Sequence, residues 1–422
     1  MTTTTVAHKY VAENPRRQRI MGAVFLIFGI LIFWLFARPV APGVVTTFGM
    51  TPGGLTRGYL GDWVLPTNST LILLAVISIL LGIYQLVKGF GKWTNPVLGV
   101  VTLFLVFGFL VFSAAGKSLN LGGMLSNIIL LSVPITLGAF CGLLSERAGV
   151  INIAIEGMML TGAMFGALVG SVTHSPWIGL LAAVLSGAIL ALVHGILSIK
   201  YKVNQIISGT VINIFATGFT SYISAKFLQK YAALNNTPTF GRTAIPGLAD
   251  IPLIGPTFFN TNFFVYAMFI FLIIIQIVLF STRAGLRLRA VGEHPKAADT
   301  LGINVFRIRY TAVLLSGMMA GFAGAYFTIG SVGRFDEMMT AGKGFIGLAA
   351  MIFGNWSPIG SFAAGLLFGL ADTVGSKLSI LGSTIPPQFM SMAPYITTMI
   401  VLAGIIGRGH APAADGEPYE KE

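Results

Sequence analysis

The sequence has few charged residues and a single cysteine, and these shortages exclude two kinds of protein. Only 9% of the 422 residues are Asp, Glu, Lys or Arg, whereas soluble domains carry about 25% charged residues. The lone cysteine, Cys141, cannot form an intrachain disulfide. Its position in an apolar run favours a small buried side chain over a reactive thiol. The chain is therefore neither an ordinary soluble domain nor one held together by internal disulfides.

Motifs for ATP hydrolysis and metal binding are also missing. A Walker A motif needs Gly-x-x-x-x-Gly-Lys-Ser/Thr, and the nearest segments, Gly91–Trp93 and Gly342–Gly344, lack the upstream glycine and the hydroxyl. The pattern His-Glu-x-x-His is absent, and the five histidines are scattered, at His8, His174, His194, His294 and His410. The sequence therefore predicts no metal site and no catalytic residues. It also disfavours a membrane-embedded lipid-processing enzyme, which would need clustered His, Asp or Glu.

Hydrophobic residues dominate the chain. They make up 55% of it, the mean hydropathy is +0.84, and apolar runs near the ~18-residue length of a membrane span recur throughout. These runs predict an all-α polytopic membrane protein with about ten to twelve transmembrane helices. The expected spans are 20–37, 70–87, 96–115, 124–144, 150–172, 177–198, 205–225, 263–281, 310–330, 344–355, 358–378 and 390–407. The run 344–355 is too short to cross alone, so we expect a broken or re-entrant helix there.

The distribution of Lys and Arg predicts the orientation. With these spans, 17 of the 26 Lys and Arg residues fall in segments assigned to the cytoplasm, as the positive-inside rule favours. We therefore expect both termini in the cytoplasm and attribute the net charge of +12 to membrane topology rather than to nucleic-acid binding. The predicted organisation is a cytoplasmic N-terminal tail at 1–19, N-terminal transmembrane segments at 20–123 with an outward loop at 38–69, a core domain at 124–407 and a cytoplasmic C-terminal tail at 408–422.

Three further features refine this organisation. The second long outward loop, 226–262, is rich in Pro and Gly and is expected to carry short interfacial helices. Gly162, Gly166 and Gly170 line one face of a predicted helix, which allows close helix packing in lipid. The polar C-terminal sequence HAPAADGEPYEKE predicts a disordered tail.

The loop 282–309 is the strongest candidate for a docking surface. It holds six of the Lys and Arg residues, at Arg283, Arg287, Arg289, Lys296, Arg307 and Arg309, and it joins two long apolar runs, so it should be cytoplasmic. Pro295 suits the first position of a helix and Gly302 suits a left-handed stop. The residues between them predict a rod of about 10 Å at the membrane surface. Such a rod suits contact with a partner protein better than it suits chemistry.

A few polar residues are expected at membrane depth, where they are costly unless they face the bundle interior. Glu156 follows Asn152 by four residues, which predicts that both project from one helix face. For Glu156 and Asp372, two roles stay open: lining a polar pathway or acting as internal hydrogen-bond ties. Asn213 is equally a candidate for helix–helix contact or for substrate contact. His194 is expected to be a structural hydrogen-bonding residue.

Three segments then resemble a known family. The sequences SERAGVINIAIEGMMLTGA, GLRLRAVGEHPKAADTLGIN and GFIGLAAMIFGNWSPIG resemble permease subunits of ABC importers in the branched-chain amino acid/ribose superfamily. Bacterial nucleoside and simple-sugar permeases are the most similar group, and the resemblance covers about Leu125 to Ile406. The first three spans and the long outward loop before Asn68 are less typical of the family.

The resemblance implies a multi-pass transport subunit of the bacterial plasma membrane that moves a nucleoside or a related simple sugar into the cytoplasm. The implied partners are a second permease subunit, expected to be a similar but different chain, a cytoplasmic ABC ATPase and an extracellular substrate-binding lipoprotein. ATP and Mg²⁺ would be used by the ATPase, and this chain would bind no cofactor of its own. The rod would be the coupling helix that sits in a groove of the ATPase, through Glu293, His294, Pro295, Ala297, Ala298, Leu301 and Gly302.

A different class of transporter also fits part of the sequence. A proton- or cation-coupled secondary transporter would use Glu156 and Asp372 as proton carriers, and broken helices near residues 150 and 350 are found in such proteins. Under either hypothesis, the predicted substrate pathway includes Asn152, Glu156, Asn213 and Asp372.

Overall fold

The computed structural model describes residues 15–51, 61–380, 392 and 410–421. In this part of the chain, ten helices are long and apolar enough to cross a membrane. They correspond to the first nine expected spans and to 358–378, while the expected span 390–407 lies outside the described residues. The expected short segment is the 11-residue helix α12 (Lys343–Phe353), too short to cross a bilayer of about 30 Å. The protein is therefore an all-α polytopic membrane protein, as predicted.

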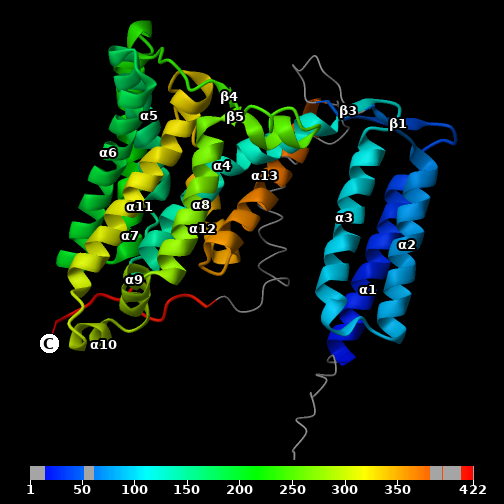
Figure 1. The fold of residues 1–422 in the computed structure, drawn as a ribbon, viewed down its shortest axis with the longest axis horizontal. Coiled ribbons are helices and arrows are strands. Elements are labelled where there is room, and N and C mark those ends of the chain that lie inside the picture. The colour runs from blue at the N-terminus through cyan, green and yellow to red at the C-terminus, as the bar shows by residue number, and fades with distance from the viewer. Residues whose placement is uncertain (1–14, 52–60, 381–391, 393–409, 422) are drawn as a thin grey trace, which may run out of the picture. The chain divides into compact units, whose positions relative to one another are not determined.

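The described residues divide into two compact units. The first unit runs up to Gly123 and contains three long helices (Figure 1). These are α1 (Pro15–Leu31), which continues as the π-helical segment Ile32–Ala37, α2 (Thr67–Val87) and α3 (Thr94–Ser113), preceded by the short turn Gly91–Trp93. Each helix is dominated by apolar residues and contains no acidic residue, which suits a lipid environment.

A small sheet closes one end of this first unit. Strand β1 (Val45–Gly49) pairs antiparallel with β2 (Trp63–Pro66) and parallel with β3 (Ser118–Asn120). The buried hydroxyl of Thr46 lies 2.8 Å from that of Thr67 and donates to the Val111 carbonyl at 2.9 Å. These bonds attach the sheet to the ends of α2 and α3. The outward loop predicted at 38–69 therefore contains ordered strands, which its Gly- and Pro-rich sequence did not indicate.

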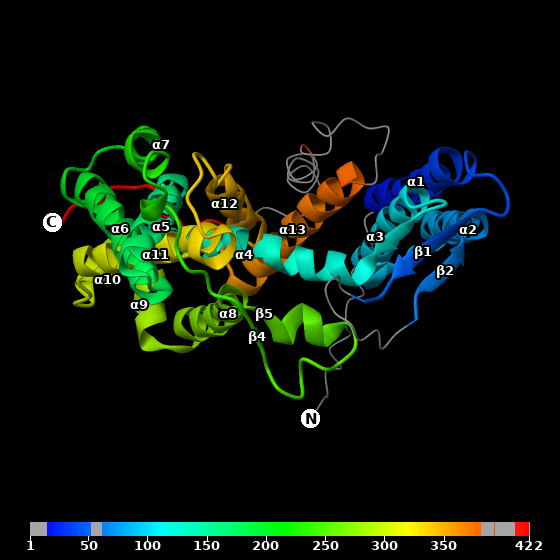
Figure 2. The same ribbon diagram turned by 90° about the horizontal axis from the view of Figure 1, so that it is seen from above.

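The second unit contains the remaining membrane helices (Figure 2). They are α4 (Leu121–Glu146), α5 (Ile155–Thr173), α6 (Pro176–Gly195), α7 (Gln205–Ile223), α8 (Phe263–Ser281), α11 (Val305–Phe327), α12 and α13 (Pro358–Ile380). Helices α6, α7 and α11 end in π-helical turns at Ile196–Lys200, Ser224–Leu228 and Thr328–Val332. The outward loop contains the short helical turns Ala232–Leu234 and Gly255–Phe259 and the paired strands β4 (Arg242–Ala244) and β5 (Asn260–Asn262). The expected short helices are present, and the strands were not predicted.

Helix α11 lies along both α5 and α6 in the centre of the second unit (Figures 1 and 2). A Cβ atom at Gly162 would lie 2.7 Å from the Cα of Gly321, which is closer than real Cβ contacts. A Cβ at Gly170 would collide with Thr237, whereas one at Gly166 would meet its neighbours at ordinary contact distance. The small-residue face of α5 therefore lets α11 approach at one end and the outward loop at the other.

Candidate functional site

The carboxylate of Glu156 caps the N-terminus of α12. Its Oε1 accepts hydrogen bonds from the Thr340 hydroxyl (2.6 Å) and the Gly342 N–H (2.8 Å), and its Oε2 accepts one from the Gly344 N–H (2.6 Å). The first N–H groups of a helix lack intrahelical partners and carry partial positive charge, so a carboxylate is a suitable acceptor. Glu156 is also the second residue of α5. One side chain therefore joins the N-terminal ends of two helices.

An ion pair fixes the same end of α12 to a third helix. Lys343, the first residue of α12, pairs with Asp372 of α13. The two side chains are only 18% and 16% exposed, so each charge is neutralised where an unpaired charge would be costly. The acidic residues Glu156 and Asp372 thus hold one short segment. We call this group the α12 anchor, and it consists of Glu156, Thr340, Gly342, Lys343, Gly344 and Asp372.

The predicted helical relationship between Asn152 and Glu156 is wrong. Helix α5 begins at Ile155, so Asn152 belongs to a non-helical segment at 147–154 that joins α4 to α5. The Asn152 side chain is fully buried and donates to the Ser316 hydroxyl at 2.9 Å. Cys141 lies beside the same hydroxyl, 3.1 Å from its oxygen, and is a buried side chain as expected.

Side chains from neighbouring helices hold this non-helical segment. Irregular backbone at membrane depth needs such partners because lipid offers none. Gln205 accepts a hydrogen bond from the Ile151 N–H at 2.7 Å, and a His194 ring nitrogen lies 2.9 Å from the Ile151 carbonyl. The Asn213 amide donates to the Ile153 carbonyl (2.8 Å) and accepts from the Gly157 N–H (2.7 Å). Asn213 therefore makes the contact between helices that was one of its two candidate roles, and His194 is a structural hydrogen-bonding residue.

The cationic loop contains two short helices rather than one. Helix α9 (Arg283–Glu293) was not predicted, and α10 (Pro295–Thr300) matches the expected rod within one residue. The His294 ring accepts a hydrogen bond from the Ala297 N–H at 3.2 Å, which starts α10, and Gly302 follows with φ of +78°. That left-handed conformation favours glycine. The sequence signals for the start and the end of this helix were therefore read correctly.

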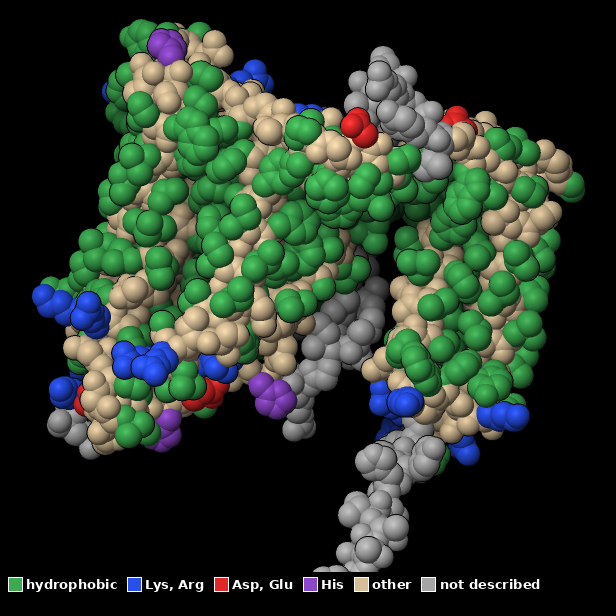
Figure 3. All heavy atoms as spheres, viewed as in Figure 1, with side chains coloured by type: hydrophobic (Ala, Val, Ile, Leu, Met, Phe, Trp, Pro, Cys, Tyr) green, Lys and Arg blue, Asp and Glu red, His purple; other side chains and the backbone are tan. Residues whose placement is uncertain are grey.

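The outer surface of this helix pair is apolar at its tip and cationic around it. Leu301 is 81% exposed, whereas Ala298 is only 2% exposed and faces the bundle. Glu293, His294 and Ala297 are exposed beside the tip, and Pro295 is half-buried. Figure 3 shows Lys and Arg side chains gathered at this end of the second unit, below sides that are covered by hydrophobic residues. An exposed leucine in a cationic surround is a suitable contact for another protein.

Helix α9 is fixed to the segment that joins α4 to α5. The backbone of Gly292 lies so close to the Arg147 carbonyl that a Cβ there would collide with it. The guanidinium groups of Arg147 and Arg289 lie over the ring of Phe280, 5.7 and 4.9 Å from its centroid. Burial lowers the pKa of Arg147, and the nearby Glu293 opposes that shift. Helix α9 is therefore in direct backbone contact with the start of the non-helical segment.

The C-terminal segment 410–421 is packed against this surface, so the expectation of a disordered tail is wrong for these residues. It passes beside α9 and α10 (red in Figure 1). The Ala414 N–H donates to the Gly292 carbonyl at 2.9 Å, and Arg309 donates to the Glu417 carbonyl at 2.8 Å. Glu420 forms an ion pair with Lys202. We call residues 410–421 the C-terminal strap.

Two carboxyl groups meet where the strap passes α4. Glu146 accepts a hydrogen bond from the Trp356 indole at 2.7 Å, and Asp415 of the strap lies near the same carboxyl. Burial raises the pKa of Asp415 to about 7, against the opposing effects of the neighbouring Glu146 and Arg309. No local sequence signal indicates this pair, because its members are far apart in the chain.

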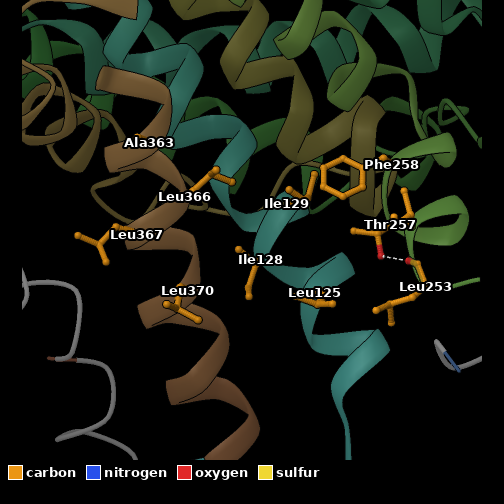
Figure 4. Close-up of a pocket in the computed structure, with 11 residues that line it drawn as sticks. Leu125, Ile128, Ile129, Leu253, Thr257, Phe258, Ala363, Leu366, Leu367 and Leu370 are labelled. Atoms are coloured by element: carbon orange, nitrogen blue, oxygen red, sulfur yellow. Dashed lines mark hydrogen bonds between the residues drawn. The ribbon is translucent and has the colours of Figure 1, made fainter. Parts of the chain in front are cut away.

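An apolar groove in the second unit does not resemble a site for a polar substrate. Its volume is about 420 Å³. It is lined by Leu125, Ile128, Ile129, Leu253, Ile254, Thr257, Phe258, Ala363, Leu366, Leu367 and Leu370 (Figure 4). The Thr257 hydroxyl already donates to the Leu253 carbonyl at 2.7 Å. A sugar or a base would find few hydrogen-bond partners there. Among the described residues, no group of three or more His, Cys, Asp or Glu is placed to hold a metal ion.

Membrane helices packed around a broken segment, with a short helix pair exposed at one end, define a membrane transport subunit. The family model described as "Branched-chain amino acid transport system / permease component" matches residues 124–406. The chain belongs to this family, and it is a multi-pass permease component of the plasma membrane. The match starts where the second unit starts, so the first three helices lie outside it.

Curated relatives agree with this assignment. The chain is 42% identical to the guanosine ABC transporter permease protein NupQ of Bacillus subtilis (strain 168), over 69% of this chain and 94% of NupQ. It is 40% identical to the nucleoside ABC transporter permease protein NupC of Lactococcus lactis subsp. cremoris (strain MG1363), over 71% and 96%. A putative glucose ABC transporter permease protein of Haloferax volcanii, TsgC13, is 32% identical over 71% and 98%. No solved structure matches the chain.

Proposed function

We propose that this chain is the membrane-spanning subunit of an ATP-driven importer that carries a nucleoside into the cytoplasm. The observation that carries the proposal is the α9–α10 pair. Leu301 is exposed at the surface of this pair, while Ala298 and Gly292 pack the pair against the bundle. A separate ATPase chain would bind this tip and use ATP and Mg²⁺. An extracellular substrate-binding lipoprotein would deliver the cargo at the opposite end, and a second, different permease chain would complete the pathway.

The end that carries α9 and α10 is assigned to the cytoplasm. Arg283, Arg287 and Arg307 are exposed there. Lys202 belongs to the same end, because it pairs with Glu420 of the strap. Such a concentration of cations is typical of the cytoplasmic side. The C-terminal strap then lies in the cytoplasm, and an even number of spans would place the N-terminus there as well.

Contacts between named residues offer a route from the ATPase to the transport pathway. Movement of α10 would displace α9, whose Gly292 lies against Arg147. The non-helical segment after Arg147 leads into α5, where Glu156 holds the N-terminus of α12. Displacing that carboxylate would tilt α12, which is too short to span the membrane and has Lys343 tied to α13. Spatial continuity motivates this sequence of movements, and coupling measurements must test it.

An uncharged nucleoside is the cargo that we favour. NupQ and NupC, at 42% and 40% identity, are named for guanosine and nucleosides, whereas TsgC13, named for glucose, is 32% identical. Glu156 and Asp372 are already bonded to donors of this chain, so neither presents a free charge that would attract a charged solute. A simple sugar such as ribose is the nearest alternative. Uptake of radiolabelled guanosine, adenosine, uridine and ribose in a strain that lacks the gene would separate them.

The α12 anchor weighs against the proton-coupled alternative. A proton carrier must be free to exchange protons during each cycle, but the Glu156 carboxylate already accepts three hydrogen bonds from Thr340, Gly342 and Gly344. Asp372 is likewise paired with Lys343. Depleting ATP while the proton gradient is kept should therefore stop uptake. Continued uptake under those conditions would support a secondary transporter.

A further inference from the structure

We propose that the C-terminal strap is a working part of the coupling apparatus. The strap positions α10, and it must stay docked for movement of α10 to reach the membrane helices. This inference rests on the proposed function, because it assumes that an ATPase acts on α10. It assigns a positioning role to residues 410–421, whose polar sequence otherwise reads as a solvent-exposed tail.

The strap is attached at four successive places along its length. The His410 N–H donates to the Asn355 side chain at 2.8 Å, in the turn between α12 and α13. The Ala414 N–H then bonds Gly292 at the end of α9. The Glu417 carbonyl accepts from Arg309 of α11, and Glu420 pairs with Lys202 between α6 and α7. One peptide therefore bridges the helix pair to three other parts of the bundle.

The strap also forms the surface on which α10 rests. Tyr419 is 6% exposed and belongs to an apolar cluster with Val291, Ala298 and Val305. Its ring lies 5.4 Å from that of Phe306, between centroids. Ala298 is the buried residue of α10, so the inner face of the coupling helix meets a cluster that includes the strap. Without Tyr419, a force on α10 would deform this cluster before it moved the bundle.

Arg309 connects the strap to α11. Its side chain is 1% exposed at the start of α11, and it donates to the backbone of Glu417 rather than to an acidic side chain. A buried guanidinium needs acceptors, because its desolvation is costly otherwise. The strap supplies one from its own main chain. The strap and α11 should therefore move together when the bundle changes state.

The test uses the full chain, assembled in membranes with its partner subunits. Tyr419→Ala should lower guanosine uptake by roughly fivefold or more, the size expected when a coupling contact is lost. The amount of ATPase that co-purifies should stay near that of the wild type, so the ATP hydrolysed per guanosine imported should rise. Tyr419→Phe keeps the ring and should restore coupling, while Lys421→Ala, at the exposed end of the strap, is the matched control.

Removal of residues 410–422 is the more severe variant and should uncouple the transporter in the same direction. The amount of assembled complex, measured by size-exclusion chromatography, separates uncoupling from misfolding. Wild-type coupling in both Tyr419→Ala and the truncated chain would overturn the inference. A wild-type chain that binds no ATPase and shows no ATP-dependent uptake would instead overturn the proposed function.

Discussion

Glu156 and Thr340 are 184 residues apart in the sequence, yet their side chains share a hydrogen bond of 2.6 Å. The bond joins the start of α5 to the segment that leads into α12. Together with the bonds from Gly342 and Gly344, it gives a short, non-spanning helix a fixed position inside the bundle. The behaviour of α12 should therefore depend on this carboxylate.

Replacing Glu156 by Gln should weaken that position. The amide lacks the negative charge that the α12 N-terminus attracts, and its NH₂ group would face an N–H donor. We expect a loss of about 1.5–3 kcal/mol of stability, typical of hydrogen bonds to a charged group, and slower uptake. Thermal unfolding in detergent measures the first effect. Thr173→Ser on the same helix, which keeps a hydroxyl able to bond the Val169 carbonyl, is the control and should match the wild type.

The stability that the Lys343–Asp372 pair contributes should depend on the presence of both partners. Lys343→Met alone leaves a largely buried carboxylate without its cation, which costs about 3–5 kcal/mol for buried pairs. The double variant Lys343→Met/Asp372→Leu removes both charges and should recover most of that loss. Thermal stability of the wild type, the two single variants and the double variant forms the cycle. A loss in the double variant equal to the sum of the two single losses would show that the pair contributes nothing to the anchor.

Two substitutions test α10 as the coupling helix. Ala298→Arg would force a charged side chain into the buried contact beneath the helix, and Gly302→Val would strain a backbone with φ of +78°. Each should lower uptake per ATP hydrolysed by roughly tenfold, the order of a typical coupling free energy. Thr300→Ser keeps the hydroxyl bond to Ala297 and is the control. Normal uptake by both variants would show that α10 does not transmit the motion.

The strap should dock more firmly in acid. The pKa of Asp415 is raised from 3.8 to about 7 in the docked form, so that form binds the proton more tightly than the free segment does. The stabilising contribution of the proton is complete below about pH 4, is lost as the pH rises to about 7, and changes little above that. Glu146 and Arg309 face the same carboxyl and are part of this equilibrium.

Hydrogen exchange measures this effect. After correction for intrinsic rates, the amide of Ala414 should be more protected at pH 5.5 than at pH 7.5. Asp415→Asn removes one of the two neighbouring carboxyl groups and should reduce the pH dependence. Protection that is independent of pH in the wild type, or that increases with pH, contradicts the assignment.

Local signals in the sequence predicted the membrane fold and α10 well. Apolar runs are long and uniform, and Pro295 and Gly302 mark the helix between them through their own backbone preferences. Asn152 shows where such reasoning fails. Its spacing from Glu156 suits one helix face, but partners on α6, α7 and α11 hold residues 147–154 in a non-helical conformation.

The α12 anchor and the strap could not be predicted for a related reason. Thr340, Lys343 and Asp372 acquire their roles only when distant segments meet, and a single sequence does not show which segments do. The strap has the composition of a disordered tail. Its backbone N–H and C=O groups nevertheless form hydrogen bonds to the bundle, and such bonds depend little on which side chains are present. Tyr419, an aromatic residue in a polar tail, is the local feature that favours packing of this segment.

The most direct test of the account measures guanosine uptake by proteoliposomes that contain this chain, a second permease, the ATPase and the binding lipoprotein. If this chain serves an ATP-driven importer, uptake requires ATP on the ATPase side, is unaffected by collapse of the proton gradient and falls sharply in Ala298→Arg. Uptake that persists without ATP and follows the proton gradient would contradict it.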